Sequence, residues 1–321
     1  MGFRSLPKGG TILVRGEEKT SGDLPTAVVS RGLLAGGSFR IFAVKADRLV
    51  DETMRKQKLS PLAAAALGRL MMASMMMALD IKLRKARVTL KLDGGGPLGL
   101  VVADAEPQGR VRGYVEHPGV DLPPSPSGKL DVASGVGRNG TLVVFRDVRM
   151  REPVSSQVPL VSGEIAEDIA GYYRFSEQTA TAVGLGVLAQ PGRVLSAGGF
   201  MVQVLPGAED SLVGNVEERV RQMPSVSRLL ELHQDARSAM EELFEGLDID
   251  WFEDVEFSLS CRCSRDLAKA LLLESLGSDA PSGSQEVRCH FCGTVYLFSK
   301  EELETEGLGT NAPNEEGGTA Q

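Results

Sequence analysis

Apolar and polar residues follow two different periods along the first two thirds of the chain. Residues 39–44 alternate between the two classes, as a strand with one buried face does. Residues 62–79 are apolar almost throughout and follow Ser60 and Pro61, a pair typical of the start of a helix. Strand-like runs separated by glycine-rich turns recur as far as residue 207. The pattern predicts an α+β domain with a buried helix inside it.

Five methionines lie in the predicted buried helix. Flexible thioether side chains fill irregular gaps in a core, and they also make adaptable binding surfaces. We expect core packing, because this helix has almost no polar face. Arg69 and Ser74 interrupt the apolar run, so we interpret it as a core helix and not as a membrane span. The methionines are Met71, Met72, Met75, Met76 and Met77.

No motif for catalysis emerges from the chain. The run Gly94-Gly95-Gly96-Pro97 leads into a strand and lacks a Lys-Ser/Thr partner, so it predicts a hairpin turn and no phosphate loop. A G-x-S-x-G elbow is missing from the sequence, and His117 and His233 have no nucleophile beside them. We therefore expect that the protein is not an enzyme.

Beyond residue 207 the pattern becomes that of amphipathic helices. Apolar residues recur at helical spacing on both sides of Pro224, and Gly246 marks a C-terminal stop. Such helices bury too little apolar area to be stable alone, so we expect them to lie on another surface. The pattern leaves open whether they are a fixed extension of the core or a mobile linker. The stripe consists of Val213, Val216, Val220, Met223, Val226, Leu229, Leu230, Ala236, Met240, Leu243 and Phe244.

Charge and the N-terminal sequence indicate which partners and which cellular compartment to expect. The net charge of -8 argues against a nucleic-acid partner, whose phosphates favour a basic surface. The first residues contain no apolar run typical of a secretory signal, and Leu6 stands where a myristoylation motif needs Ser or Thr. We expect a cytoplasmic protein that binds no membrane, and in that compartment cysteines are normally reduced.

All four cysteines lie close together near the C-terminus. Cys261 and Cys263 form a C-x-C pair, and Cys289 and Cys292 form a C-x-x-C pair after 25 intervening residues. Four thiolates complete the tetrahedral shell of one Zn²⁺ ion, and structural disulfides are the main alternative. His290 lies between the second pair, but four sulfurs already fill the shell, so we expect it to be a bystander.

The cysteine segment is small enough to need a metal. Residues 257–300 include a predicted short helix after Cys263 and a predicted hairpin around the second cysteine pair. A closed four-sulfur site has no open position for a substrate, which argues against zinc catalysis. Thiolates are nevertheless open to oxidants, and losing the metal unfolds a domain of this size. An inert structural site and a redox switch both remain possible from this chemistry.

The chain resembles the heat shock protein 33 family of redox-regulated chaperones in several motifs that occur in the same order. They include "CRCSRD", "VRCHFCGTVYLFS", "YYRFSEQTATAVGLGV" and "SAGGFMVQVLPGA", and the resemblance runs from about Arg31 to about Leu303. It implies an α+β fold with a large N-terminal core of mixed helices and strands, a helical linker and a small zinc-binding domain. The expected bounds are 1–207 for the substrate-binding core, 208–256 for the linker, 257–306 for the zinc-binding redox-switch domain and 307–321 for a disordered tail.

The resemblance also implies a mechanism. Reduced protein with one zinc ion on Cys261, Cys263, Cys289 and Cys292 is expected to be an inactive monomer. Peroxide under unfolding stress, or hypochlorous acid, is expected to form the disulfides Cys261–Cys263 and Cys289–Cys292 and to release zinc. The zinc-binding domain and linker then unfold, and the exposed apolar surface holds unfolding client proteins without ATP, commonly as a homodimer.

Two features depart from the family pattern, and other functions remain as alternatives. The spacer between the cysteine pairs is shorter than expected, with "GSDAPSGSQE" in place of an acidic helical stretch, and the extension before Arg31 is unusual. The main alternative is a constitutive protein-interaction module with an inert zinc site. An RNA-binding zinc ribbon conflicts with the acidic composition.

Overall fold

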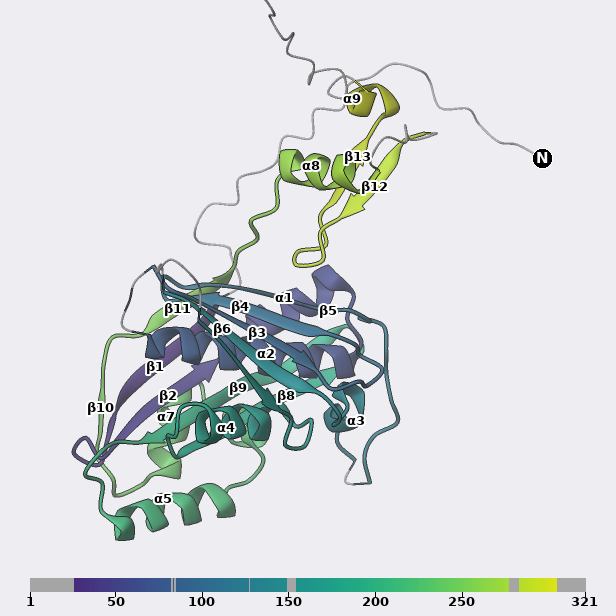
Figure 1. Ribbon diagram of the computed structural model, residues 1–321. Helices are drawn as coiled ribbons and strands as arrows, with labels where there is room; N and C mark the ends of the chain where they lie inside the picture. Colours follow the sequence, from purple (N-terminus) through teal and green to yellow (C-terminus); the bar gives the residue numbers. More distant parts are fainter. Residues whose placement is uncertain are drawn as a thin grey trace, which may run out of the picture.

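The computed structural model describes residues 26–81, 83, 85–126, 128–148, 154–276 and 283–304. Residues 1–25 of the N-terminal extension, the tail at 307–321 and much of the "GSDAPSGSQE" spacer lie outside these residues. Within them the chain has a mixed α+β fold, as the sequence predicts, and a small C-terminal domain projects from one end of the larger body (Figure 1).

An 11-stranded sheet forms the framework of the larger body, in the order β7-β6-β3-β4-β5-β11-β1-β2-β9-β8, with β10 pairing β1 off this path. Neighbouring strands are antiparallel except for β11 and β5, which are parallel. The strands are β1 (Thr26–Leu34), β2 (Phe39–Lys45), β3 (Arg87–Asp93), β4 (Val101–Glu106), β5 (Arg110–Val115), β6 (Thr141–Asp147), β7 (Val154–Pro159), β8 (Thr181–Gln190), β9 (Arg193–Val204), β10 (Ile249–Trp251) and β11 (Val255–Leu259). The antiparallel pairing of β3 with β4 confirms the hairpin predicted at the glycine run.

Nine helices accompany the strands in the described residues. Four belong to the larger body, three to the predicted linker and two to the C-terminal domain. They are α1 (Asp47–Gln57), α2 (Pro61–Asp80), α3 (Val132–Val136), α4 (Ile165–Phe175), α5 (Asp210–Gln222), α6 (Val226–Glu231), α7 (Ala236–Leu243), α8 (Arg265–Leu276) and α9 (Lys300–Glu304).

Helix α2 is the buried helix that the sequence predicts. The Ser60 side chain accepts a hydrogen bond from the Ala63 N–H at 3.0 Å, and Pro61 occupies the first turn. All five methionines are buried, so the prediction of core packing is confirmed and a methionine binding surface is excluded. The helix has the length and composition of a membrane span, but it packs against protein on all sides. The one partly exposed residue in its middle, Arg69, pairs with Glu164 at 2.5 Å.

Strand β2 shows how the sheet is covered on both faces. Phe39 and Ile41 pack on one side, and Phe42 and Val44 pack on the other, as the two-residue period of a strand requires. Helices α1 and α2 lie on the second side, whereas α6 and α7 lie on the first. The alternation in the sequence predicts one buried face, and the linker helices bury the other as well.

The predicted linker contains helices and strands. Every stripe residue from Val226 to Phe244 is buried except Leu243, which is partly buried, so the expected packing on another surface is confirmed. The helices end at Leu243, close to the stop predicted at Gly246, and the rest of the stretch up to Glu256 contains β10 and the first two residues of β11, which join the core sheet beside β1. The predicted helical linker is therefore helical only as far as Leu243, and its last part forms strands that pair with β1. Phe257 is fully buried in the main core, so the core sheet extends into the predicted C-terminal domain.

The C-terminal domain has a very small core. Helix α8 packs near the hairpin of β12 (Gln285–Arg288) and β13 (Val295–Phe298), which confirms the predicted helix and hairpin. Its buried apolar residues are Ala268, Phe298 and Leu303, with a few partly buried neighbours. So small an apolar core does not stabilise a domain alone, and a further cross-link is expected.

Candidate metal centre and the linker-covered face

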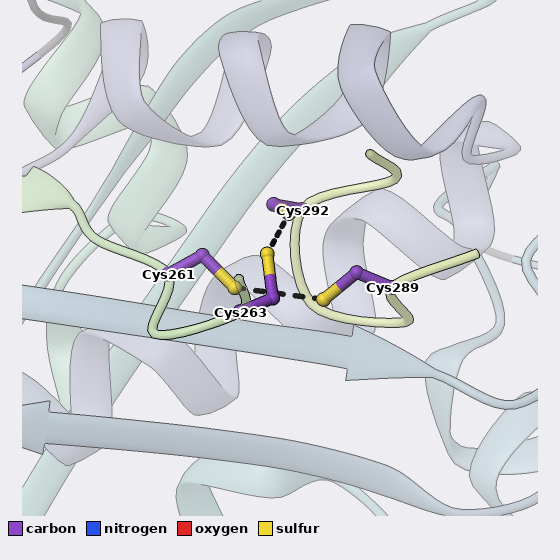
Figure 2. A group of neighbouring side chains, drawn as sticks. All are labelled: Cys261, Cys263, Cys289 and Cys292. Atoms are coloured by element: carbon purple, nitrogen blue, oxygen red, sulfur yellow. Dashed lines mark hydrogen bonds between the residues drawn. The ribbon is translucent and has the colours of Figure 1, made fainter. Parts of the chain in front are cut away.

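The two cysteine motifs meet at the base of the C-terminal domain. Cys261 and Cys263 lie in the segment between β11 and α8, and Cys289 and Cys292 lie in the turn between β12 and β13 (Figure 2). The four sulfur atoms lie within 4.8 Å of one another, and all four side chains are partly buried free thiols. The prediction that these residues form one cluster is therefore confirmed.

The spacing of the sulfurs fits a tetrahedral ion. The distance is 3.5 Å from Cys261 Sγ to Cys289 Sγ and 3.3 Å from Cys263 Sγ to Cys292 Sγ. A Zn–S bond of about 2.3 Å corresponds to sulfur–sulfur edges of about 3.8 Å in a regular tetrahedron. Small adjustments would give four equal bonds, and four sulfurs leave no position for a water or substrate.

Four thiolates this close together repel one another, and the protein environment shifts the pKa values of the thiols in different directions. Burial and contact with neighbouring sulfurs raise the pKa of Cys263 and of Cys289 above the usual thiol value. Burial also acts on Cys292, but hydrogen bonds with the Thr294 hydroxyl and backbone N–H outweigh it and lower its pKa to about 7. A divalent cation removes the repulsion among all four. The donor set therefore suits zinc electrostatically as well as geometrically.

A tight turn presents the second cysteine pair. We call residues Cys289–Gly293 the knuckle. The Gly293 N–H donates to the Cys289 carbonyl at 2.8 Å, and the Cys289 N–H donates to the Thr294 carbonyl at 2.9 Å. Gly293 has a φ of +72°, which an L side chain rarely adopts, and a Cβ there would lie 2.8 Å from the Lys56 carbonyl oxygen. Glycine is therefore needed both for the turn and for its contact with α1.

The knuckle docks directly on the core. Gln57, at the end of α1, donates from Nε2 to the Gly113 carbonyl at 2.7 Å and to the Phe291 carbonyl at 2.8 Å. The Phe291 ring packs edge-on against Tyr114 at 5.0 Å and lies 4.3 Å from the Arg112 guanidinium. Sequence patterns did not predict this contact, although an aromatic residue between the two cysteines of a C-x-x-C pair is a usable signal.

A cavity beside this contact reaches the metal ligands. Its volume is about 260 Å³, and Lys56 and Arg112 of the core line it together with Cys261, Cys263 and Cys292. A molecule as small as hydrogen peroxide fits such a space easily. Three of the four cysteines therefore border one open cavity, in contrast to a site sealed inside a core.

The histidines take no part in the cluster. His290 lies in the knuckle, but its ring packs edge-on against Tyr114 at 5.6 Å, and it is not among the four clustered ligands. His233 lies between α6 and α7, 3.0 Å from a Glu242 carboxylate oxygen. The expectation that His290 is a bystander agrees with this placement.

The linker helices cover an apolar sheet face on the side opposite α2. We call this surface of β1, β2, β8 and β9 the linker-covered face. Its buried side chains include Leu34, Phe39, Ile41, Phe200 and Val202, which pack with the apolar residues of α5–α7. Helix α6 has only six residues and α7 only eight, so each owes its stability to this packing.

One arginine joins the linker to the segment that leads to the cysteines. Arg237 of α7 donates from Nη2 to the Phe252 carbonyl at 2.7 Å and to an Asp254 carboxylate oxygen at 2.5 Å. Its Nε also lies 3.2 Å from Ser30 Oγ of β1. Asp254 directly precedes β11, and Cys261 follows that strand. A short continuous connection therefore runs from α7 through Arg237 and β11 to the metal centre.

Comparison with known proteins agrees with the sequence motifs. The family described as Hsp33 protein matches residues 28–299. The 33 kDa chaperonin of Halalkalibacterium halodurans is 42% identical over 277 residues, or 84% of this chain and 94% of that protein. The one from Geobacillus kaustophilus is 39% identical over 282 residues, or 85% of this chain and 95% of that protein.

A solved structure is also similar. The crystal structure of the 33 kDa chaperonin of Thermotoga maritima, a heat shock protein 33 homolog, aligns with a TM-score of 0.78 at 36% identity. The match covers 87% of this chain and 96% of that one, so it includes the core, the linker and the cysteine region. Because the family model matches most of the chain and these relatives are similar over almost their whole length, the chain belongs to the Hsp33 family of chaperones.

Proposed function

We propose that this protein is an ATP-independent holdase whose client-binding surface is covered in the reduced state and exposed by oxidation. The observation that carries the proposal is the combination of a four-sulfur cluster with marginal helices over an apolar face. The cluster supplies a sensor, and the linker-covered face supplies a surface for unfolding proteins. Cytoplasmic location, a reduced monomer and an oxidised dimer are parts of the same proposal.

In the reduced state the thiolates of Cys261, Cys263, Cys289 and Cys292 would hold one zinc ion. Bound zinc would neutralise their charge and cross-link the two motifs. The chain's own contribution is to present the knuckle to the core through Gln57 and to keep the small domain folded. Because the apolar core of that domain is so small, metal binding supplies most of its stability, about 10–16 kcal/mol in small zinc domains.

Oxidation would remove the ligands. Two thiolates give two electrons to one molecule of hydrogen peroxide and form one S–S bond, while the peroxide takes up two protons and leaves as two molecules of water. The proposed bonds are Cys261–Cys263 and Cys289–Cys292. The shortest sulfur distances in the reduced structure instead join Cys261 to Cys289 and Cys263 to Cys292, so the pairing calls for direct mapping by mass spectrometry.

Unfolding of the C-terminal domain would reach the linker through β11 and Arg237. Once residues after β11 lose their fold, the Asp254 segment loses its anchor on one side, and the hydrogen bonds that Arg237 makes to it weaken. Helices α6 and α7 are short and depend on their contacts with the core, so a small loss of support is enough to release them. Release exposes the linker-covered face to client proteins.

Light scattering of a heat-unfolded client tests the proposal, with reduced and peroxide-treated protein compared at equal concentration. Zinc content, free thiols and binding of the dye ANS are measured on the same samples. We expect loss of one zinc and four thiols together, new dye binding and protection by the oxidised form alone. Equal protection by both forms would refute the switch, and retained zinc with unchanged helicity would favour the inert-site alternative.

A further inference from the structure

We infer that the surface under α6 is built to seat a helix, and that the client segments it takes are amphipathic helices with a small residue facing Gly186. We call this surface, which includes Lys45, Gly184, Gly186 and Gly198 on β2, β8 and β9, the α6 seat. The inference deepens the proposed function and rests on it for the release of α6. Three features of the seat carry it.

The first feature is a pair of glycines that leaves the sheet surface under α6 without side chains; we call this pair the glycine floor. Gly186 of β8 and Gly198 of β9 are direct partners in the sheet, and both face the linker. A Cβ on Gly186 would lie 2.5 Å from the Ser227 backbone nitrogen, and a Cβ on Gly198 would lie 2.4 Å from Leu230 Cδ1. Residues of α6 therefore occupy the space that a side chain at either glycine would need. Any side chain larger than hydrogen at Gly186 displaces the helix.

The second feature is the pattern of the residues that enter the seat. Val226, Leu229 and Leu230 are buried, at relative positions i, i+3 and i+4, which only a helix places on one side. Ser227, next to the first of them, is the small residue that lies over the glycine floor. A Cβ on Gly184 would lie 2.4 Å from Phe200 Cε1 and 2.9 Å from Val226 Cγ2, so a side chain there would meet both the Phe200 ring and the helix.

The third feature is a cation at the C-terminal end of the helix. Lys45 Nζ donates to the Leu230 carbonyl at 2.9 Å and to the His233 carbonyl at 2.6 Å. The last carbonyls of a helix lack partners and carry partial negative charge, so an ammonium group there is favourable. Asp47 lies 3.6 Å from the same Nζ and helps to hold it in place. In an extended segment successive carbonyls point in opposite directions, and two do not converge on one ammonium group.

Together these features define the ligand chemistry. The seat favours a short helix with apolar residues at i, i+3 and i+4, a small residue at i+1 and a free C-terminal turn. An unfolding protein that keeps local helices offers such segments, whereas a fully extended chain does not. A flat apolar surface would bind both kinds of segment without preference.

A peptide with the sequence of residues 225–235 tests the inference. Positions 228 and 232 are exposed, so a covalent bridge between them holds the peptide helical without touching the seat. Its affinity is measured by fluorescence anisotropy on two full-length proteins. One is the oxidised wild type, and the other is a reduced double variant, Val226→Asp with Leu230→Asp, in which two buried carboxylates keep α6 off the sheet. Trypsin cleavage at Arg228 verifies that release.

Matched controls distinguish a surface that requires a helix from an apolar surface that binds any apolar segment. The peptide change Ser227→Leu puts a bulky side chain over Gly186. Glu231→Pro in the unbridged peptide lies beyond the first turn, so it breaks the helix, and because Glu231 is exposed the change keeps every apolar residue. Lys45→Met in the protein removes the cation and keeps the length of the side chain. We expect each change to weaken binding at least tenfold, as the loss of charge-assisted hydrogen bonds or of close packing does.

Each outcome of this experiment either supports the inference or overturns it. Binding to the reduced double variant with the expected losses supports the seat, even if oxidised wild-type protein fails to bind, because that failure would concern the switch alone. Equal binding of the helical and the proline-containing peptides overturns the inference, and so does the absence of an effect of Lys45→Met. Client protection by oxidised protein without peptide binding to either protein also overturns it, while leaving the holdase function intact.

Discussion

Docking of the knuckle on the core should set how easily the metal centre is oxidised, and Phe291→Ala tests this. The Phe291 ring contacts Tyr114 edge-on and lies beside the Arg112 guanidinium. An aromatic pair contributes about 0.5–1.5 kcal/mol and an exposed cation–π contact about 0.5–1 kcal/mol. The truncation therefore removes about 1–2.5 kcal/mol of docking free energy. Since the ring is only partly buried, we take the lower end of this range.

The loss of docking free energy should increase the rate at which the cysteines are oxidised. A disulfide needs its sulfurs about 2.05 Å apart, so Cys289 and Cys292 must move relative to each other, and a docked knuckle resists that movement. With about 1.4 kcal/mol for each factor of ten, undocking by 1 kcal/mol raises the undocked population about fivefold. We expect zinc release by peroxide to accelerate by a similar factor, measured with a chromogenic zinc chelator.

The control for this variant is Phe175→Ala. Phe175 is an exposed phenylalanine at the end of α4, where it has no contact with the metal centre among the described residues. It should leave the release rate unchanged, and both variants should retain one zinc before oxidation. If Phe291→Ala releases zinc at the wild-type rate, the knuckle contact has no part in controlling oxidation and our reading of it is wrong.

Three further predictions address the connection, the metal and the linker. Arg237→Met should release the linker at a lower peroxide concentration. Trp251 donates a hydrogen bond to Glu241 of α7 at 2.9 Å, so its fluorescence should report the release. An unchanged peroxide concentration at half-release would contradict the connection through Arg237. Cys292→Ser should abolish stoichiometric zinc binding and lower the helicity of the C-terminal domain in far-UV circular dichroism. The hydrogen bond from the Ser238 N–H lowers the pKa of Asp235. The cap therefore stabilises α7 fully above the unfolded pKa of about 3.9, and this stabilisation is lost as pH falls through the folded pKa. Trp251 fluorescence should show the loss in the wild type and not in Asp235→Asn.

The sequence predicts the fold best where local chemistry decides the structure. Ser60 and Pro61 mark the start of α2, and the apolar stripe from Val226 to Phe244 identifies helices that need a partner surface. The cysteine spacing identifies all four members of the sulfur cluster, because two closely spaced pairs are what a tetrahedral sulfur site needs. These features depend on neighbours in sequence or on one strong interaction.

Long-range pairing was the part that local patterns did not reveal. Strand β10 lies in the stretch predicted as helical linker, and β11 spans its boundary with the predicted zinc-binding domain. The strand form of both depends on pairing with β1, more than 200 residues earlier. A three-residue strand such as β10 has too few residues to show a period of its own. Gln57 and Phe291 meet only because the C-terminal domain docks on α1, and nothing in either segment encodes the partner.

The glycines of β8 and β9 carried a readable signal that the sequence analysis did not use. In β8, Gly184 and Gly186 alternate with Leu185 and Val187, so one face of the strand is apolar and the other is bare. A period-two pattern of glycine would weaken an ordinary strand, because glycine costs backbone entropy and adds no packing. The pattern makes sense when another main chain fills the space, as Ser227 of α6 does. A bare strand face opposite an apolar one is thus itself an indication that a helix docks there, and in this protein that helix lies in the segment proposed to leave.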